Sequence, residues 1–182
     1  MTLAPTIGDR LATTFAARGF HEPGVAALRE AAGVSLRTLY RHFPSREAMV
    51  VGALDARHAT YRAWLDEGRP DGRGDGTGDA PVDHAFERLA DWMRSHAPTG
   101  CLCAQALASH PHSEPIAKAV RHHKADTRAL LAERCALAGY GDPDLPDALF
   151  VLHEGQTAAS VTIGPDTALA ATRASLRALL QR

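Results

Sequence analysis

Residues 31–46 read AAGVSLRTLYRHFPSR, and a glycine and a proline in this stretch indicate where its helices end. Gly33 follows a short helical pattern, at a position where glycine adopts a left-handed backbone at little cost. Pro44 ends the next segment, because the residue before a proline is pushed out of the helical region. Between them, Ser35 is a good N-cap for a helix over residues 36–43. The stretch therefore predicts two short helices joined by a glycine turn, which is a helix-turn-helix layout.

The predicted helix 36–43 has one apolar side and an unusual remaining surface. Leu39 and Phe43 lie four residues apart and can face a core together. The other positions carry groups that can hydrogen-bond phosphate oxygens or base edges, namely Arg37, Thr38, Tyr40, Arg41 and His42. Two interpretations fit this pattern: a helix that reads DNA, or a solvated amphipathic helix with ordinary surface arginines.

Residues 7–54 closely resemble the N-terminal domain of the TetR (tetracycline repressor) family of bacterial transcription regulators. The resemblance rests on RLATTFAARGF, on LREAAGVSLRTLYRHFPSRE and on the apolar positions that follow. It implies that residues 36–38 lie nearest the bases of an operator and that Tyr40, His42 and Arg46 hold phosphates. The full DNA-binding set that we expect is Ser35, Leu36, Arg37, Thr38, Tyr40, Arg41, His42 and Arg46.

Two positions in this region depart from the family pattern. Gly24 stands where Ser or Thr usually caps the second helix, and Arg29 stands where alanine is common. A glycine cap costs only a few tenths of a kcal/mol relative to the usual residues. The fold is therefore expected to tolerate Gly24, although it lacks the hydroxyl group that can also contact the DNA backbone at this position.

Composition and charge narrow the class of protein. No run of about 18 apolar residues occurs, the N-terminus lacks a signal-peptide pattern, and the three cysteines do not suggest a disulfide framework. These features predict a cytoplasmic protein. The net charge is −1, but eight arginines against five acidic residues make residues 1–62 net +3, and twelve basic against sixteen acidic residues make the remainder net −4. A mildly basic head (residues 1–62) followed by an acidic body (the remaining residues) fits a DNA-binding protein.

The rest of the chain also shows helical periodicity and no strand pattern. We predict an all-α fold, with a three-helix helix-turn-helix domain over residues 1–54 and a helical ligand-binding and dimerisation domain over residues 55–182. Residues 1–6 are expected as a frayed arm, and the Gly- and Asp-rich residues 69–81 as a flexible loop. The expected helices span residues 7–18, 25–32, 36–43, 45–67, 82–96, 101–109, 114–138, 144–163 and 166–181.

The last two predicted helices are too apolar for an exposed surface. The resemblance implies that they pair with their copies in a second subunit as a four-helix bundle, although they could also be ordinary core. A two-fold dimer would match a palindromic operator. The expected interface residues are Leu149, Leu152, Gly155, Ala159, Leu169, Leu176 and Leu180.

The body is expected to bind a small apolar effector, because its apolar positions are interspersed with histidines and tryptophans that need polar partners when buried. The expected lining residues are Trp64, Phe86, Trp92, Met93, His96, Cys101, Cys103, His123, Phe150, His153 and Gln156. For any one of them, ordinary core packing is the alternative. We expect no cofactor.

The roles of Cys101 and Cys103 stay open at this stage. Cys101 and Cys103 could pack as small apolar residues, could sense oxidants or electrophiles, or could bind a soft metal ion together with His96 and His110. A DNA-binding protein without an effector is a further possibility. An enzyme is not expected, because no hydrolase, P-loop or zinc-protease motif occurs. The sequence thus predicts a dimeric, ligand-responsive regulator, in its simplest form a repressor that a small molecule releases from its operator.

Overall fold

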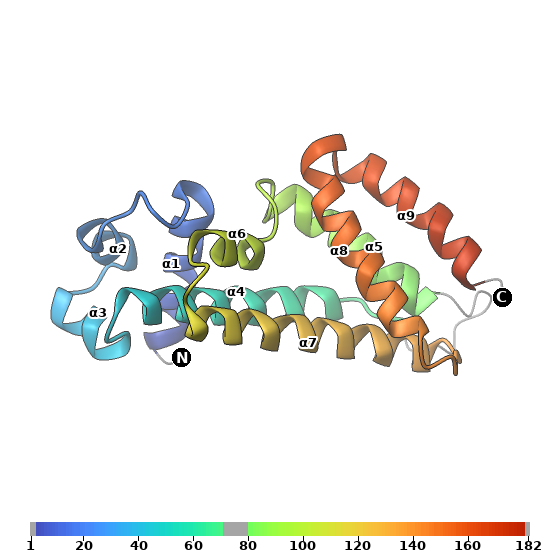
Figure 1. Cartoon of the computed structure of the whole chain (residues 1–182), viewed down its shortest axis with the longest axis horizontal. Helices are drawn as coiled ribbons and strands as arrows, with labels where there is room; N and C mark the ends of the chain where they lie inside the picture. Colours follow the sequence, from blue (N-terminus) through green and yellow to red (C-terminus); the bar gives the residue numbers. More distant parts are fainter. Residues whose placement is uncertain (1–2, 71–79, 181–182) are drawn as a thin grey trace. The chain divides into compact units, whose positions relative to one another are not determined.

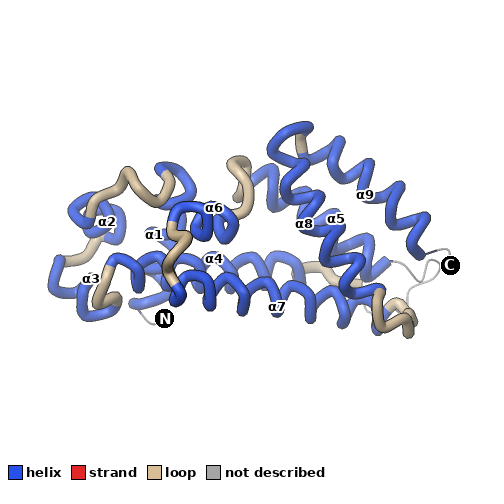
Figure 2. Tube along the Cα trace, in the orientation of Figure 1, coloured by secondary structure: helices blue, strands red, loops and turns tan. Residues whose placement is uncertain are grey.

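The part of the chain that the structure describes consists of helices and the loops between them. The computed structural model of this 182-residue protein describes residues 3–70 and 80–180, and no strand occurs in these ranges (Figures 1 and 2). This confirms the all-α prediction. The helices are α1 (Leu3–Arg18), α2 (Val25–Ala32), α3 (Leu36–His42), α4 (Arg46–Asp66), α5 (Ala80–Ser95), α6 (Leu102–Ser109), α7 (Glu114–Leu137), α8 (Leu145–Ile163) and α9 (Pro165–Leu180).

Two helices begin at least two residues earlier than the sequence predicts, and a proline lies in the first turn of each. Helix α1 begins at Leu3, so the expected frayed arm over residues 1–6 is wrong from residue 3 onward; Met1 and Thr2 lie outside the described residues. Helix α5 begins at Ala80, with Pro81 as its second residue. A proline is tolerated there because its missing N–H would have no helical partner. Most of the predicted loop, residues 71–79, also lies outside the described residues.

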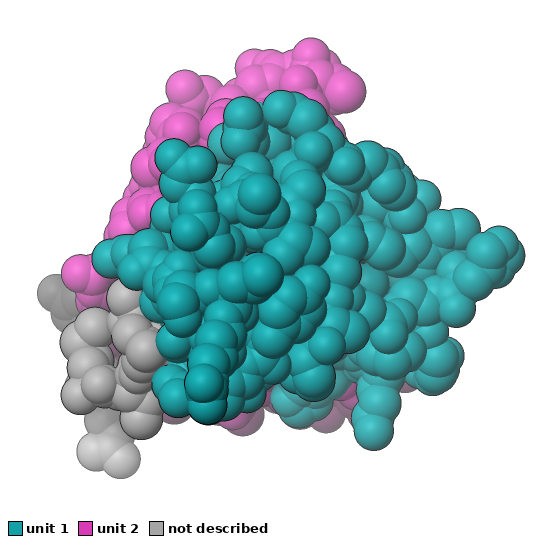
Figure 3. Space-filling model, turned by 90° about the vertical axis from the view of Figure 1, so that its left-hand side faces the viewer, with its two compact units in different colours: residues 1–60, 101–124 teal, residues 61–100, 125–182 magenta. Residues whose placement is uncertain are grey.

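The chain folds into two compact units, and each unit draws on two separate segments. The first unit comprises residues 1–60 and 101–124, and the second comprises residues 61–100 and 125–182 (Figure 3). The transitions fall inside α4 and inside α7. Both long helices therefore contribute residues to both units. The domain boundary after residue 54 stays a prediction from the sequence.

The core of the first unit is formed by α1, α2, α3 and α4 together with parts of α6 and α7. Its buried apolar side chains are those of Ile7, Leu11, Ala12, Phe15, Phe20, Leu28, Ala32, Leu39, Met49, Val50, Ala53, Leu54, Leu102, Ala106, Ile116 and Val120. Two glycines allow close packing in this core. A Cβ on Gly8 of α1 would lie 2.9 Å from the carbonyl oxygen of Gly52 in α4, and a Cβ on Gly52 would collide with the ring of Phe43. Residue 52 therefore connects α1 to the segment that ends α3.

The second unit packs α5, α8 and α9 against one another, together with the C-terminal part of α7. Its main cluster includes Phe86, Leu130, Leu131, Leu149 and Leu176, all of which are almost fully buried. A smaller cluster contains Leu89, Trp92, Met93 and Ala97, with Tyr61 and Trp64 packed against it.

Candidate functional site

The turn between α2 and α3 has the backbone that the sequence predicts. Gly33 has a φ of 68°, in the left-handed region, and its N–H donates to the carbonyl oxygens of Arg29 and Glu30 at the end of α2. The Arg10 guanidinium of α1 donates to the Ala32 carbonyl oxygen at 3.0 Å, and a Cβ on residue 33 would collide with it. Any residue other than glycine would therefore meet both backbone strain and this guanidinium.

Helix α3 is capped and anchored as expected. The Ser35 hydroxyl oxygen accepts from the Thr38 N–H at 3.1 Å, and Leu39 is fully buried in the core of the first unit. Ser45 caps α4 in the same way, since its hydroxyl oxygen accepts from the Ala48 N–H at 3.0 Å. These local hydrogen bonds cap the N-terminal ends of α3 and α4.

The opposite side of α3 is exposed and chemically mixed. Leu36 and Tyr40 are 48% and 41% exposed, although both are large apolar side chains, and Arg37 and Arg41 are exposed beside them. Thr38 and His42 are half-buried. Arginine and tyrosine can donate to phosphates and base edges, whereas an apolar side chain can contact a thymine methyl group. This surface has the groups that a DNA-reading helix needs.

Arg46 has an intramolecular role that the sequence does not reveal. Its guanidinium donates to the carbonyl oxygen of Pro23 at 2.7 Å and to that of Phe20, so it ties the start of α4 to the loop between α1 and α2. The arginine is half-buried. A phosphate contact by Arg46 stays a prediction, and it would use donors that these two bonds leave available.

A capped helix-turn-helix with an exposed basic and aromatic face defines a DNA-binding protein of the helix-turn-helix class. Residues 9–53 match the sequence profile of the bacterial regulatory proteins of the tetR family. The match spans the helix-turn-helix segment, from α1 into α4, so this segment resembles the DNA-binding domain of that family. No curated protein matches the sequence.

Solved structures of the family resemble the chain over nearly its whole length. SCO4454, a TetR-family transcriptional regulator from Streptomyces coelicolor, is 25% identical, with a TM-score of 0.75 and coverage of 94% of this chain and 93% of that one. A TetR transcriptional regulator from Chloroflexus aurantiacus is 16% identical and shares the fold, with a TM-score of 0.73 and coverage of 99% and 94%. The similarity of fold therefore extends well beyond residues 9–53.

Several of the expected effector-binding residues lie together in the second unit. The His96 ring stacks on Trp92 at 4.5 Å between centroids and meets Trp64 edge-on at 4.7 Å. Tyr61, which the sequence does not single out, packs on Trp92, and its hydroxyl lies 2.6 Å from Nε2 of the buried His153. Met93 belongs to the same small cluster, whereas Phe150 packs against the main cluster of this unit.

Gln156 is a buried residue of the second unit whose polar atoms are only partly satisfied. It is 2% exposed, and its Nε2 donates to the Phe86 carbonyl oxygen at 2.9 Å. Its Oε1 is buried and has no hydrogen-bond partner among the described residues. Because a buried acceptor without a partner is costly, this oxygen is suited to accept from a bound molecule or a water.

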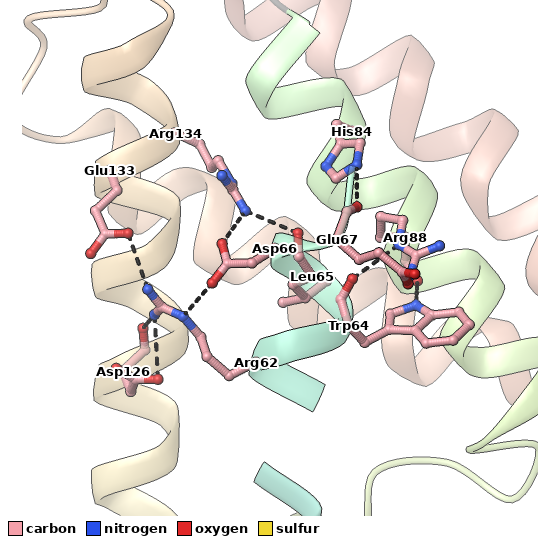
Figure 4. Close-up of polar contacts among 10 residues, drawn as sticks. All are labelled: Arg62, Trp64, Leu65, Asp66, Glu67, His84, Arg88, Asp126, Glu133 and Arg134. Carbon is pink, nitrogen blue, oxygen red and sulfur yellow. Dashed lines mark hydrogen bonds and ion pairs between the residues drawn. The ribbon is translucent and has the colours of Figure 1, made fainter. Parts of the chain in front are cut away.

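Paired charges surround the C-terminal end of α4 in the second unit. Arg62 bonds Asp66, Asp126 and Glu133, and the fully buried Arg134 donates to Asp66 at 2.7 Å and to the Leu65 carbonyl oxygen at 2.9 Å (Figure 4). Burial lowers the pKa of Arg134, and the Asp66 carboxylate opposes that effect. Asp66 thus partly compensates the cost of removing a guanidinium from water.

The same figure shows how α4 is joined to α5. Trp64 Nε1 donates to the Arg88 carbonyl oxygen and Arg88 Nε donates to the Trp64 carbonyl oxygen, each at 3.0 Å (Figure 4). The Arg88 guanidinium also lies 3.9 Å from the centre of a Trp64 ring. These contacts hold Trp64 in one orientation, which positions one wall of the aromatic cluster.

The remaining expected effector residues belong to the first unit. Cys103 Sγ lies 3.8 Å from Nδ1 of the buried His123, and Cys101 Sγ lies 3.6 Å from the Lys124 ammonium. No cysteine forms a disulfide. Within the described residues, no three His, Cys, Asp or Glu side chains are arranged to hold a metal ion, so the proposed soft-metal set with His96 and His110 has no support there.

The expected dimer interface needs a correction. Leu149 and Leu176 are 0% and 1% exposed because they fill the core of their own unit, so neither lies on the outer surface of α8 and α9. Leu152, Ala159, Leu169 and Leu180 are half-buried, and Gly155 is exposed. The exposed large apolar residues of α8 are Val151, Val161 and Ile163, at 70%, 48% and 53%.

Among the described residues, no helix has the length and hydropathy needed to cross a membrane.

Proposed function

We propose that this protein binds a palindromic operator as a homodimer in the cytoplasm and regulates transcription, as a repressor that a small molecule releases from DNA. The observation that carries the proposal is the outer face of α3, where Leu36, Arg37 and Tyr40 are exposed on a helix whose other side is buried. Two such heads related by a two-fold axis would enter successive major grooves of a palindromic site.

The first experiment selects preferred sequences from a pool of random duplexes and measures binding by fluorescence anisotropy. Arg37→Ala is expected to change the preferred sequence, because a side chain near base edges contributes specificity. Tyr40→Phe is expected to weaken binding to all sequences to a similar extent. Arg18→Ala is the matched control, since Arg18 is exposed, pairs with Glu22 on the surface and lies outside α3. Selection of no preferred sequence by the wild-type protein would contradict the proposal.

Arg46 requires its own pair of variants because of its contacts with Phe20 and Pro23. If Arg46 also meets a phosphate, Arg46→Ala lowers the salt slope of binding by about one. Arg46→Lys keeps a charge but loses the forked geometry that reaches both carbonyl oxygens. Loss of thermal stability in both variants with an unaltered salt slope would assign Arg46 to the fold alone.

The face of α8 that includes Val151 supports the dimer. Its side chain is 70% exposed, and Gly155 and Ala158 on the same helix are also exposed. Small residues allow two helices to approach closely, and a two-fold axis would bring this face against its own copy. A stable monomer at micromolar concentration by light scattering would remove this part of the proposal.

The proposed effector site is the cluster of Trp64, Trp92, His96 and His153 in the second unit, with Gln156 as the polar anchor. The support is the unpartnered Gln156 Oε1 next to Phe86, together with three rings that hydrogen-bond or stack with histidines. A small-molecule library is screened for compounds that raise the melting temperature and weaken operator binding. Gln156→Leu should reduce the affinity of such a compound, whereas Leu107→Ala, on the exposed side of α6, should not. If no compound does both, a DNA-binding protein without an effector remains.

A further inference from the structure

Two cysteines of the first unit lie beside basic groups from two other helices. Cys101 precedes α6 and Cys103 lies in its first turn, while His123 and Lys124 are consecutive residues of α7. Cys103 Sγ is 3.8 Å from His123 Nδ1, and Lys124 Nζ is 3.6 Å from Cys101 Sγ. Each thiol therefore has its own nitrogen partner, in an arrangement that neither α6 nor α7 could provide alone.

The imidazole of His123 also has a partner on its other nitrogen. Its Nε2 lies 2.8 Å from a carboxylate oxygen of Asp55 in α4. If Nε2 carries the proton and donates to Asp55, Nδ1 has a lone pair directed at the Cys103 thiol. Burial, followed by the stacked His58 ring at 4.4 Å and the neighbouring His122, lowers the pKa of His123, whereas Asp55 raises it. The ring is therefore neutral near pH 7 and can accept the thiol proton.

The electrostatic surroundings favour the thiolate once it forms. The partly buried Arg57 of α4 interacts with both Cys101 and Cys103: burial lowers the pKa of Arg57, and the two thiolate charges raise it. By the same interaction, the guanidinium stabilises the thiolates. A thiolate is the nucleophilic form of cysteine, and nearby cations increase the fraction of it at neutral pH.

We propose that Cys103 is a covalent modification site for soft electrophiles of the α,β-unsaturated carbonyl class, with His123 as the base that takes the thiol proton and Asp55 as the residue that positions His123. The Cys103 proton moves to His123 Nδ1, and the thiolate adds to the β-carbon to form a carbon–sulfur bond. The π electrons of the carbon–carbon double bond move toward the carbonyl to give an enolate, which takes a proton from the imidazolium or from water. The thiol has then added across the double bond, and no oxidant is consumed.

The modification would act on the DNA-binding unit directly, so this regulatory consequence rests on the proposed function. Cys103 is half-buried and packs against the core that contains Leu39 of α3 and Leu54 of α4. A protein core is close-packed, so several added atoms at this position must displace its neighbours. Because α3 rests on the same core, displacement is expected to weaken operator binding without any molecule in the aromatic cluster of the second unit.

The test uses N-ethylmaleimide on the full chain, with intact mass and peptide mapping to locate the label. Cys103 should react at least about tenfold faster than glutathione at pH 7, with the midpoint of its pH profile below the ordinary cysteine pKa of about 8.5. Cys103→Ser should abolish this fast phase, and Cys101→Ser should retain a fast phase at Cys103. Asp55→Asn, at an exposed position that the fold should tolerate, should slow labelling severalfold and move the midpoint upward. A Cys103 rate no faster than glutathione, or a profile unchanged by Asp55→Asn, would overturn the proposal.

A second measurement separates this proposal from the proposed function. Stoichiometrically labelled protein should lose at least about tenfold in affinity for a selected duplex, while Cys103→Ser treated with the same reagent keeps its affinity. If unlabelled protein binds no selected sequence, the regulator proposal fails and the fast thiol remains. If labelled protein binds DNA as tightly as unlabelled protein, the regulatory consequence is overturned even though the modification occurs.

Discussion

Gly52 provides the sharpest connection between core packing and α3, the helix that we propose reads DNA. A Cβ at this position would lie 2.9 Å from Cζ and 3.0 Å from Cδ1 of Phe43, and closer still to Cε1. Carbon atoms in ordinary contact are about 3.5–4.0 Å apart, so Gly52→Ala requires the Phe43 ring to move by roughly 1 Å. Phe43 is the C-cap residue of α3, and its movement shifts the end of that helix.

Two effects of opposite sign determine the stability of Gly52→Ala. Alanine favours a helix interior over glycine by about 1 kcal/mol. Overpacking of a filled core costs about 1–3 kcal/mol. We therefore expect a net loss of up to about 2 kcal/mol in the free energy of unfolding, together with weaker operator binding, because the clash is made with the segment that ends α3.

Chemical denaturation and anisotropy measure these two quantities in the wild type and in four variants. Gly155→Ala is the matched control for stability alone: within one chain nothing lies within 4 Å of its would-be Cβ, so the free energy of unfolding should rise by about 0.5–1 kcal/mol. Because Gly155 lies on the proposed dimer face, this variant does not serve as a control for operator binding. In a Phe43→Leu background the ring is absent, and Gly52→Ala should become neutral or stabilising. If Gly52→Ala stabilises as much as Gly155→Ala and leaves operator affinity unaltered, the packing argument is refuted.

Four other outcomes are expected. Ser35→Ala removes the cap on α3 and should cost about 1 kcal/mol in urea denaturation while weakening DNA binding. Val151→Glu should leave the fold within about 0.5 kcal/mol but lower the dimer fraction in light scattering. Asp66→Asn leaves the buried Arg134 without a charged partner and should cost about 1–3 kcal/mol, a range reduced because Asp66 is 41% exposed, whereas Asp126→Asn should cost under about 1 kcal/mol. Because the pKa of His123 is lowered on folding, the unfolded chain binds more protons as pH falls below about 6.5, so stability should fall there, and His123→Gln should flatten that part of the profile.

Local chemistry explains why the end of α2 and the starts of α3 and α4 could be predicted from the sequence. Gly33, Ser35 and Ser45 act through neighbours within five residues, so their turn and caps follow from the order of residues alone. The same local reasoning does not predict correctly where α1 begins. A proline in a first turn, as Pro5 is in α1, is compatible both with a helix and with a loop before one, and the local pattern does not choose between them.

Contacts between distant residues account for most of what the sequence does not reveal about the candidate sites. Arg46 meets Pro23 across 23 positions, His123 meets Asp55 across 68, and Tyr61 meets His153 across 92. Periodicity identifies apolar faces but does not say which face meets which. For this reason Leu149 and Leu176 are predicted as interface residues, although their own unit buries them.

The division of the chain into interleaved units limits how this protein can be cut and recombined. A fragment that ends after residue 54 or 60 contains every residue of α3, but it lacks Leu102, Ala106, Ile116 and Val120, which complete the core beneath it. Such a fragment would expose an apolar surface to water. If residues 1–60 alone were joined to the C-terminal part of a related protein, their core would have to pack against that protein's residues in place of these four side chains. A working chimera must therefore also exchange α6 and the N-terminal half of α7.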